Sequence, residues 1–277
     1  MANDFTLRGY NTLLKRNAKS LLEPVITLVI LVALGLGAGA LGAMVGVGGG
    51  VIISPVLAFL GLPPAQIAST SLFAVSSTSI SSTIEYSKQK KIEYRLGLEM
   101  AAFSIPGAVI GAYLSDYISL ESFKLWFGVL LILTGIYVLY RNEIFKKNIL
   151  IKRSMAVRFS VFAITFGAGI ISSLFGVGGG IVYVPTMLIV IGMTIQRAAP
   201  TSQFTLMMTS IAGILAHSYL GHPDYLQAAA LAAGAFAGGQ LGARLSKYTN
   251  EIILQKLLAV VLIGVSVKLI FDWLASR

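Results

Sequence analysis

The pentapeptide Gly46-Val47-Gly48-Gly49-Gly50 recurs as Gly176-Val177-Gly178-Gly179-Gly180, with every position raised by 130. Further identities follow both copies at an offset of 130 or 131: Pro55 and Pro185, Thr70-Ser71 and Thr201-Ser202, and Gly111-Ala112-x-Leu114-Ser115 and Gly242-Ala243-x-Leu245-Ser246. One added residue over roughly 70 positions indicates an internal duplication. The sequence therefore predicts two tandem homologous repeats.

The chain around these glycines is too apolar for a soluble domain. Of its 277 residues 56% are hydrophobic and 12% are charged, whereas about a quarter of the residues in soluble domains are charged. A helix needs about 20 apolar residues to cross a membrane. Eight runs come close to or exceed this length, at residues 24–45, 67–86, 96–113, 123–140, 159–175, 198–219, 226–245 and 252–273. We predict an all-α, polytopic membrane protein.

Two further apolar runs, at residues 51–62 and 181–193, are too short to cross. We expect each to be a re-entrant or broken helix. The predicted organisation is a basic N-terminal arm at 1–20, a first repeat at 21–140, a basic cytoplasmic linker at 141–158 and a second repeat at 159–277. Each repeat then holds about four full spans and one short helix.

Two topologies fit this organisation. If the short helices are re-entrant beside four full spans, the repeats are parallel, and 16 of the 21 Lys and Arg residues lie on the cytoplasmic side and 5 outside. If the short helices cross, the repeats are inverted and the division is 14 against 7. Because cytoplasmic loops are enriched in Lys and Arg, we expect the parallel arrangement.

The duplicated glycines have the chemistry of an anion site. Non-helical backbone at membrane depth must face protein or a wet cavity. Glycine permits positive φ, and a helix that begins just afterwards adds the positive end of its dipole. A nucleotide-binding P-loop is not expected, because Val51 and Ile181 stand where that motif needs Lys.

We therefore predict a substrate site made from backbone amides and nearby hydroxyl and amide side chains. Its residues are Gly46, Gly48, Gly49, Gly50, Pro55, Thr70, Ser71, Gly176, Gly178, Gly179, Gly180, Pro185, Thr201, Ser202 and Gln203. The alternatives are structural: the glycines allow close helix packing, the prolines kink the short helices, and the hydroxyls cap the helices that follow.

Few ionisable residues fall within the predicted spans. Glu85, Glu99 and His217 lie near span ends that we expect to be cytoplasmic, and they are the candidates for proton coupling. The alternative for the two glutamates is pairing with nearby Lys or Arg. Arg197 and Arg244 could draw anions toward the site or could anchor lipid headgroups.

Several functions are not expected. The net charge of +10 is divided among short tracts between apolar runs, which favours a membrane protein that contacts lipid over a nucleic-acid binder. The chain has no Cys, hence no thiol nucleophile and no thiolate metal site. No hydrolase or metalloprotease motif is present, so we predict neither an enzyme nor a cofactor. The loose group His217, His222 and Asp224 is a poor metal site.

A glycine loop followed by a short helix with a proline, present twice among eight or so spans, resembles the TauE/SafE family of sulfite exporters and related permeases. The resemblance covers about residues 24–273. It implies transport of small sulfur-containing or organic anions, such as sulfite, thiosulfate or organosulfonates, across the cell membrane, with substrate and direction differing among family members. We predict a secondary transporter that exports such an anion, with protons as a possible coupling ion. The alternatives are an anion channel and a non-transporting scaffold for a sulfur-metabolising complex. The sequence leaves the oligomeric state undetermined.

Overall fold

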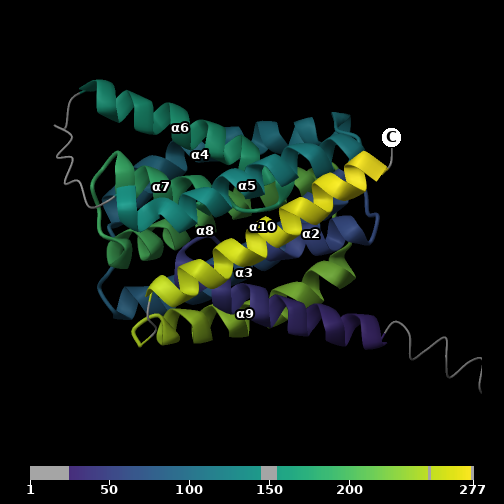
Figure 1. Ribbon diagram of the computed structural model, residues 1–277, viewed down its shortest axis with the longest axis horizontal. Helices are drawn as coiled ribbons and strands as arrows, with labels where there is room; N and C mark the ends of the chain where they lie inside the picture. Colours follow the sequence, from purple (N-terminus) through teal and green to yellow (C-terminus); the bar gives the residue numbers. More distant parts are fainter. Residues whose placement is uncertain (1–24, 145–154, 249–250, 276–277) are drawn as a thin grey trace, which may run out of the picture.

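The computed structural model describes residues 25–144, 155–248 and 251–275. These residues form helices and no strand. The N-terminal helix is Val25–Val45. The others are α2 (Gly50–Phe59), α3 (Pro64–Lys88), α4 (Tyr94–Leu114), η1 (Ser115–Tyr117), α5 (Leu120–Ile144), α6 (Met155–Phe175), α7 (Gly180–Ile189), α8 (Ile195–Tyr219), α9 (Tyr225–Leu245) and α10 (Glu251–Ala275) (Figure 1).

The all-α prediction is confirmed for these residues, and each predicted apolar run lies on one helix. Helices α2 and α7 have ten residues each, enough for about 15 Å. Each follows a glycine pentapeptide, which we call the first (46–50) and second (176–180) glycine turn. The predicted arm at 1–20 and residues 145–154 of the linker lie outside the described residues.

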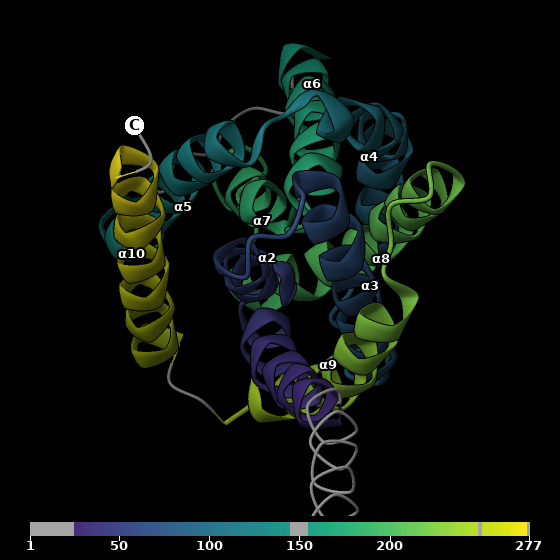
Figure 2. The ribbon, with the colours of Figure 1, turned by 90° about the vertical axis from the view of Figure 1, so that its right-hand side faces the viewer.

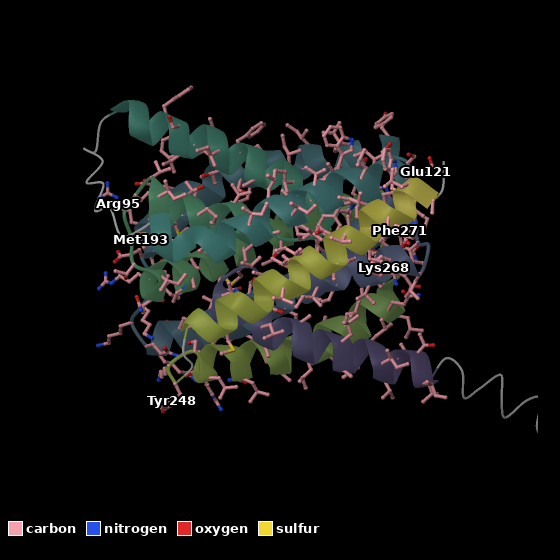
Figure 3. All side chains as sticks on the ribbon, viewed as in Figure 1. Arg95, Glu121, Met193, Tyr248, Lys268 and Phe271 are labelled. Carbon is pink, nitrogen blue, oxygen red and sulfur yellow. The ribbon has the colours of Figure 1, made fainter. Side chains whose placement is uncertain are left out.

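The bundle has two ends. Arg95, Met193 and Tyr248 lie at one, which we call the Arg95 end, and Glu121, Lys268 and Phe271 lie at the other, the Glu121 end (Figure 3). Helix α7 runs from the second glycine turn toward the Arg95 end. Helix α2 runs toward the Glu121 end. Its last residue is Phe59, and the centre of the Phe59 ring lies 4.3 Å from Lys268 Nζ. The two short helices thus point away from each other, with their N-termini in the interior.

The parallel topology is wrong. That topology puts residues 88–95 on the cytoplasmic side and Arg197 outside, but Glu93 and Arg197 form an ion pair. It also placed Asp116 outside and His222 inside, yet Asp116 Oδ1 lies 2.8 Å from His222 Nε2. The expectation failed because a count of Lys and Arg does not reveal how each glycine turn reverses the chain. In the structure the helix before each turn and the short helix form a hairpin that opens toward one end.

The two halves of the chain are interleaved. Close contacts through glycine join the N-terminal helix to α9 and join α6 to α4. A Cβ at Gly238 would strike the backbone of Leu36, and a Cβ at Gly107 would strike that of Phe166. Helices α5 and α10 pack together on one flank (Figure 2). Helices α2 and α7 lie between this pair and α3 and α8.

The surface and the interior reverse the pattern of a soluble protein. Leu133, Val260 and Phe271 are more than half exposed, whereas Thr78 and Ser104 are fully buried. An apolar outer surface with polar groups inside suits a lipid environment. By length and hydropathy alone, Val25–Val45 and Tyr94–Tyr117 are the described helices that could cross a membrane. The count of eight spans stays a prediction.

Candidate substrate site at the glycine turns

Each glycine turn reverses the chain between a long helix and a short one. Gly46 and Gly48 have φ of 81°, and Gly176 and Gly178 have φ of 70° and 69°. Side chains disfavour this left-handed region, so glycine is required at all four positions. In the first turn the Gly42 carbonyl accepts hydrogen bonds from the amides of residues 46, 47 and 48. The sequence therefore folds here into a compact turn that directs the next helix back along the bundle.

The two turns touch each other, although they come from different halves of the chain. A Cβ at Gly180 would lie 2.7 Å from the Gly46 carbonyl oxygen, and a Cβ at Gly50 would strike the Gly176 carbonyl. All five residues of each turn are buried. The structure thus brings together the two segments that the sequence analysis assigned to one site.

Two apolar side chains cover the place where the turns meet. Val75 on α3 and Leu206 on α8 are fully buried. Both would contact a Cβ added at Gly48 and a Cβ added at Gly178. Sequence reasoning missed Val75 and Leu206, although the repeat relates them to each other in the same way as it relates Ser71 to Ser202.

Serine side chains hold each turn from the opposite half of the chain. Ser71 Oγ donates to the Gly176 carbonyl at 2.8 Å, and Ser202 Oγ donates to the Gly46 carbonyl at 2.7 Å. These two predicted site residues therefore anchor the turns. Gln203 joins them through Nε2, which donates to the Gly42 carbonyl at 2.9 Å.

The predicted threonines differ from each other. Thr201 Oγ1 donates to the Arg197 carbonyl within α8 and accepts from the Glu93 amide, so it links α8 to the α3–α4 connection. Thr70 Oγ1 is buried and has no hydrogen-bond partner among the described residues, and the same holds for Gln203 Oε1. Buried polar atoms without a partner are uncommon and point to a missing water or ligand.

Both short helices begin without a side-chain cap at Gly49 and Gly179. Their first amide hydrogens and the positive ends of both helix dipoles therefore meet in the interior. Pro55 and Pro185 lie inside these helices. Neither proline lies in a glycine turn, so their predicted contact with substrate stays a prediction.

A cluster of hydroxyl groups lies beside the second turn. The Tyr183 hydroxyl group contacts Ser104 Oγ and lies 3.3 Å from Thr209 Oγ1. A Cβ at Gly179 would lie 2.6 Å from the same hydroxyl. The first glycine turn has no matching cluster. In the repeat Ile53 corresponds to Tyr183, and Ala235 corresponds to Ser104. The sequence analysis missed this cluster, since its members come from three helices.

The charged candidates lie away from the glycine turns. At the Arg95 end, Glu85 accepts from Arg244 Nε at 3.4 Å and Glu99 from Arg95 Nε at 3.3 Å. His217 was expected at the same end as the glutamates, but it lies toward the Glu121 end. There it is fully buried, and its Nε2 is 3.0 Å from the Ser173 carbonyl oxygen.

Asp224 does not join the two histidines. Its Oδ1 accepts hydrogen bonds from the amides of Leu226 and Gln227 and so caps α9. Within the described residues no group of three or more His, Cys, Asp or Glu side chains is arranged to hold a metal ion.

Comparison with known proteins identifies the family. A sequence model described as sulfite exporter TauE/SafE matches residues 31–269. The probable membrane transporter protein YunE of Bacillus subtilis is 34% identical over 273 residues, which cover 91% of this chain and 100% of that protein. No solved structure shows a significant match.

More distant relatives carry the same kind of description. The probable membrane transporter protein MJ0441 of Methanocaldococcus jannaschii is 29% identical and covers 74% of this chain and 77% of its own length. YfcA of Escherichia coli, also described as a probable membrane transporter protein, is 23% identical. The match covers 81% of this chain and 83% of that protein. The chain belongs to the sulfite exporter TauE/SafE family of membrane transporters.

Proposed function

We propose that this protein is a multi-pass secondary transporter of the cell membrane that exports a small sulfur-containing or organic anion, such as sulfite, thiosulfate or an organosulfonate. The observation that carries the proposal is the meeting of two uncapped short helices at contacting glycine turns in the interior. The family supports transport as the activity.

The chemistry around the turns suits an anion that must be released again. The donors are backbone amides and hydroxyl groups, supplemented by two helix dipoles. Every Lys and Arg whose side chain the structure describes is at least partly exposed. Neutral donors bind an oxyanion less tightly than a buried cation would, since hydrogen bonds to charged donors are about twice as strong. Moderate affinity allows the cargo to leave on the far side.

The contact between the turns represents a closed state in this proposal. Gly180 and Gly46 are too close for an anion to lie between them, and Val75 and Leu206 cover the junction. Binding therefore requires the two helix hairpins, residues 25–59 and 155–189, to separate. The hairpins open toward opposite ends of the bundle. Two inverted repeats of this kind would expose one central site alternately to each side of the membrane.

The distribution of basic residues orients the bundle. Arg95 marks one end (Figure 3). Lys88, Lys90 and Lys91 precede it in the same connection, Arg197 and Arg244 pair with Glu93 and Glu85 there, and Lys247 adjoins Tyr248. Among residues with described side chains, seven Lys and Arg thus lie at the Arg95 end. Two lie at the Glu121 end, namely Lys268 (Figure 3) and Lys124, which follows Glu121 by three residues on α5. We infer that the Arg95 end faces the cytoplasm.

Counterflow in proteoliposomes tests the proposal. Purified protein is reconstituted with unlabelled anion inside, and uptake of radiolabelled sulfite, thiosulfate or a small organosulfonate is measured. We expect saturable uptake driven by the internal anion. We expect no uptake by Gly179→Leu that has inserted normally, because this side chain would collide with the Tyr183 ring beside the second glycine turn.

The matched control is Gly167→Leu, at a helical glycine whose Cβ would meet no atom within 4 Å. It should transport like the wild type. Large single-channel currents would overturn the proposal in favour of a channel. Absent flux together with a stoichiometric protein partner would overturn it in favour of a scaffold.

A further inference from the structure

The two histidines of the chain form a continuous chain of polar contacts at the Glu121 end. His217 Nδ1 lies 2.8 Å from His222 Nδ1. His222 Nε2 lies 2.8 Å from Asp116 Oδ1, and His217 Nε2 lies 3.0 Å from the Ser173 carbonyl oxygen. His217 is fully buried, the His222 side chain is 11% exposed, and Asp116 is 44% exposed. The contacts thus run from the surface to the last turn of α6.

These contacts need one more proton than two neutral histidines carry. The Ser173 carbonyl only accepts, so His217 Nε2 carries a proton, and an ionised Asp116 only accepts, so His222 Nε2 carries another. Two neutral imidazoles have one N–H proton each. Both Nδ1 atoms would then face each other with lone pairs at hydrogen-bond distance. A third proton between them turns this repulsion into a hydrogen bond.

The third proton belongs to the histidine pair, because imidazole holds a proton more tightly than a carboxylate does. With it, the charges of the pair and of Asp116 cancel, which lowers the cost of burying the cation. A metal ion does not fit between the rings. Two nitrogens at about 2.0 to 2.1 Å from one zinc ion in tetrahedral geometry would lie well beyond the 2.8 Å that separates these two.

We propose that Asp116, His222 and His217 bind one proton, and that this proton holds the end of α6, and with it the second glycine turn, in the closed position. The Asp116 carboxylate is the surface entry point. Given the orientation above, this point faces the outside of the cell. The role in transport rests on the proposed function, whereas the proton itself rests on the contacts alone.

The first half of the chain supplies an internal comparison. Tyr86 occupies the position that corresponds to His217, and its hydroxyl group donates to the Ala43 carbonyl at 3.0 Å. Ala43 corresponds to Ser173 in the repeat. Both halves therefore anchor the end of the helix that precedes the glycine turn. A phenol keeps its proton at neutral pH, so the second turn alone has an anchor that responds to protons.

On the described parts of the helices packed around these residues, the other charged side chains are used elsewhere or lie at the far end. Helices α3, α4 and α6 pack against η1 and against α8, and α9 packs against α3. The carboxylate of Asp224 is used in capping α9. The described charged side chains of α3, α4, α8 and α9, namely Glu85, Lys88, Arg95, Glu99, Arg197 and Arg244, lie at the Arg95 end. Asp116 is thus the charge that faces the pair.

Nitrogen NMR of the full-length protein in lipid nanodiscs tests the proton directly. Since the chain has two histidines, labelling histidine with ¹⁵N gives four ring nitrogens. At pH 7 we expect three of the four to be protonated, with one proton shared by the two Nδ1 atoms. Asp116→Asn keeps an acceptor oxygen but removes the charge, so proton affinity should fall about tenfold or more. Two neutral rings in the wild type at pH 7 would overturn the proposal.

A second variant separates the proton from the anchor. His217→Tyr copies Tyr86 and so keeps a donor to the Ser173 carbonyl without a titrating ring. In the wild type the bound proton keeps the second glycine turn closed, so counterflow should rise as the pH rises from 6 to 8. The variant should keep the wild-type unfolding temperature but lose this pH dependence. Unchanged pH dependence would overturn the coupling role. If the wild type shows no counterflow at all, the proposed function fails, while the NMR result still decides the proton site.

Discussion

The Ser71 hydroxyl group donates a hydrogen bond to the carbonyl oxygen of Gly176, which lies 105 positions further along the chain. The same contact occurs in reverse, from Ser202 to Gly46. Each half of the chain therefore holds the glycine turn of the other half. A movement of either turn relative to the helix that holds it must break or shift its hydrogen bond.

The serine anchors are expected to stabilise the closed bundle. Ser71→Ala or Ser202→Ala would leave a buried carbonyl oxygen without its donor. This should lower the free energy of unfolding by about 1 to 3 kcal/mol for each change. Thermal unfolding of the purified variants measures the effect. Ser122→Ala, which removes an exposed hydrogen bond to Ser119, is the control and should change stability by no more than about 0.5 kcal/mol.

The contact between the turns should exclude even one methyl group. In Gly180→Ala the new Cβ would lie 2.7 Å from the Gly46 carbonyl oxygen and 2.7 Å from Val47 Cα, so the turns must move apart. We expect a lower unfolding temperature and impaired counterflow. Gly37→Ala and Gly167→Ala meet no atom within 4 Å and should behave like the wild type. Equal behaviour of Gly180→Ala and these controls would contradict the described contact.

Two ion pairs at the Arg95 end should differ in their effect on stability. The Glu85 side chain is 10% exposed, so Arg244→Ala would strand a nearly buried carboxylate. We expect a loss of about 1 to 3 kcal/mol, less than for a fully buried pair because Arg244 is itself 57% exposed. Arg197→Ala removes an exposed pair and should cost no more than about 1 kcal/mol. Adding Glu85→Gln to Arg244→Ala should restore most of the loss, as chemical unfolding would show.

The arrangement of the two ends can be read by cysteine labelling, because the chain has no Cys. Single cysteines at Ser119 and Gly221 should react with a membrane-impermeant maleimide from one side of the membrane. Cysteines at Lys90 and Gly192 should react from the other. In the parallel topology Ser119 and Gly192 lie on the same side of the membrane. Labelling of cysteines at these two positions from one side would therefore contradict the bundle described here.

The sequence was sufficient to predict the helices and the segments that meet. Apolar runs long enough to cross a membrane locate the long helices, and glycine triplets with a short apolar run locate α2 and α7. The same repeat offsets select Ser71 and Ser202, which do hold the turns. These features depend on local composition or on internal identity.

Features that depend on contacts across the bundle were not predicted. Counting Lys and Arg favoured the parallel topology by a small margin, since the count does not reveal that α2 and the helix before it form a hairpin. Val75 and Leu206 look like ordinary apolar residues in sequence. The contact between Asp116 and His222 joins two segments that are far apart in the chain. No local pattern marks such a pair.

Thermal stabilisation of the purified protein by anions tests most directly whether the joined glycine turns bind the cargo. A ligand at a hundred times its dissociation constant adds about 2.7 kcal/mol to the stability of the native state. With sulfite, thiosulfate, an organosulfonate and a carboxylate as the panel, at least one should raise the unfolding temperature of the wild type and of Gly167→Leu. It should leave a folded Gly179→Leu unchanged. Equal stabilisation of Gly179→Leu, or none in the wild type with any of these anions, would contradict the account.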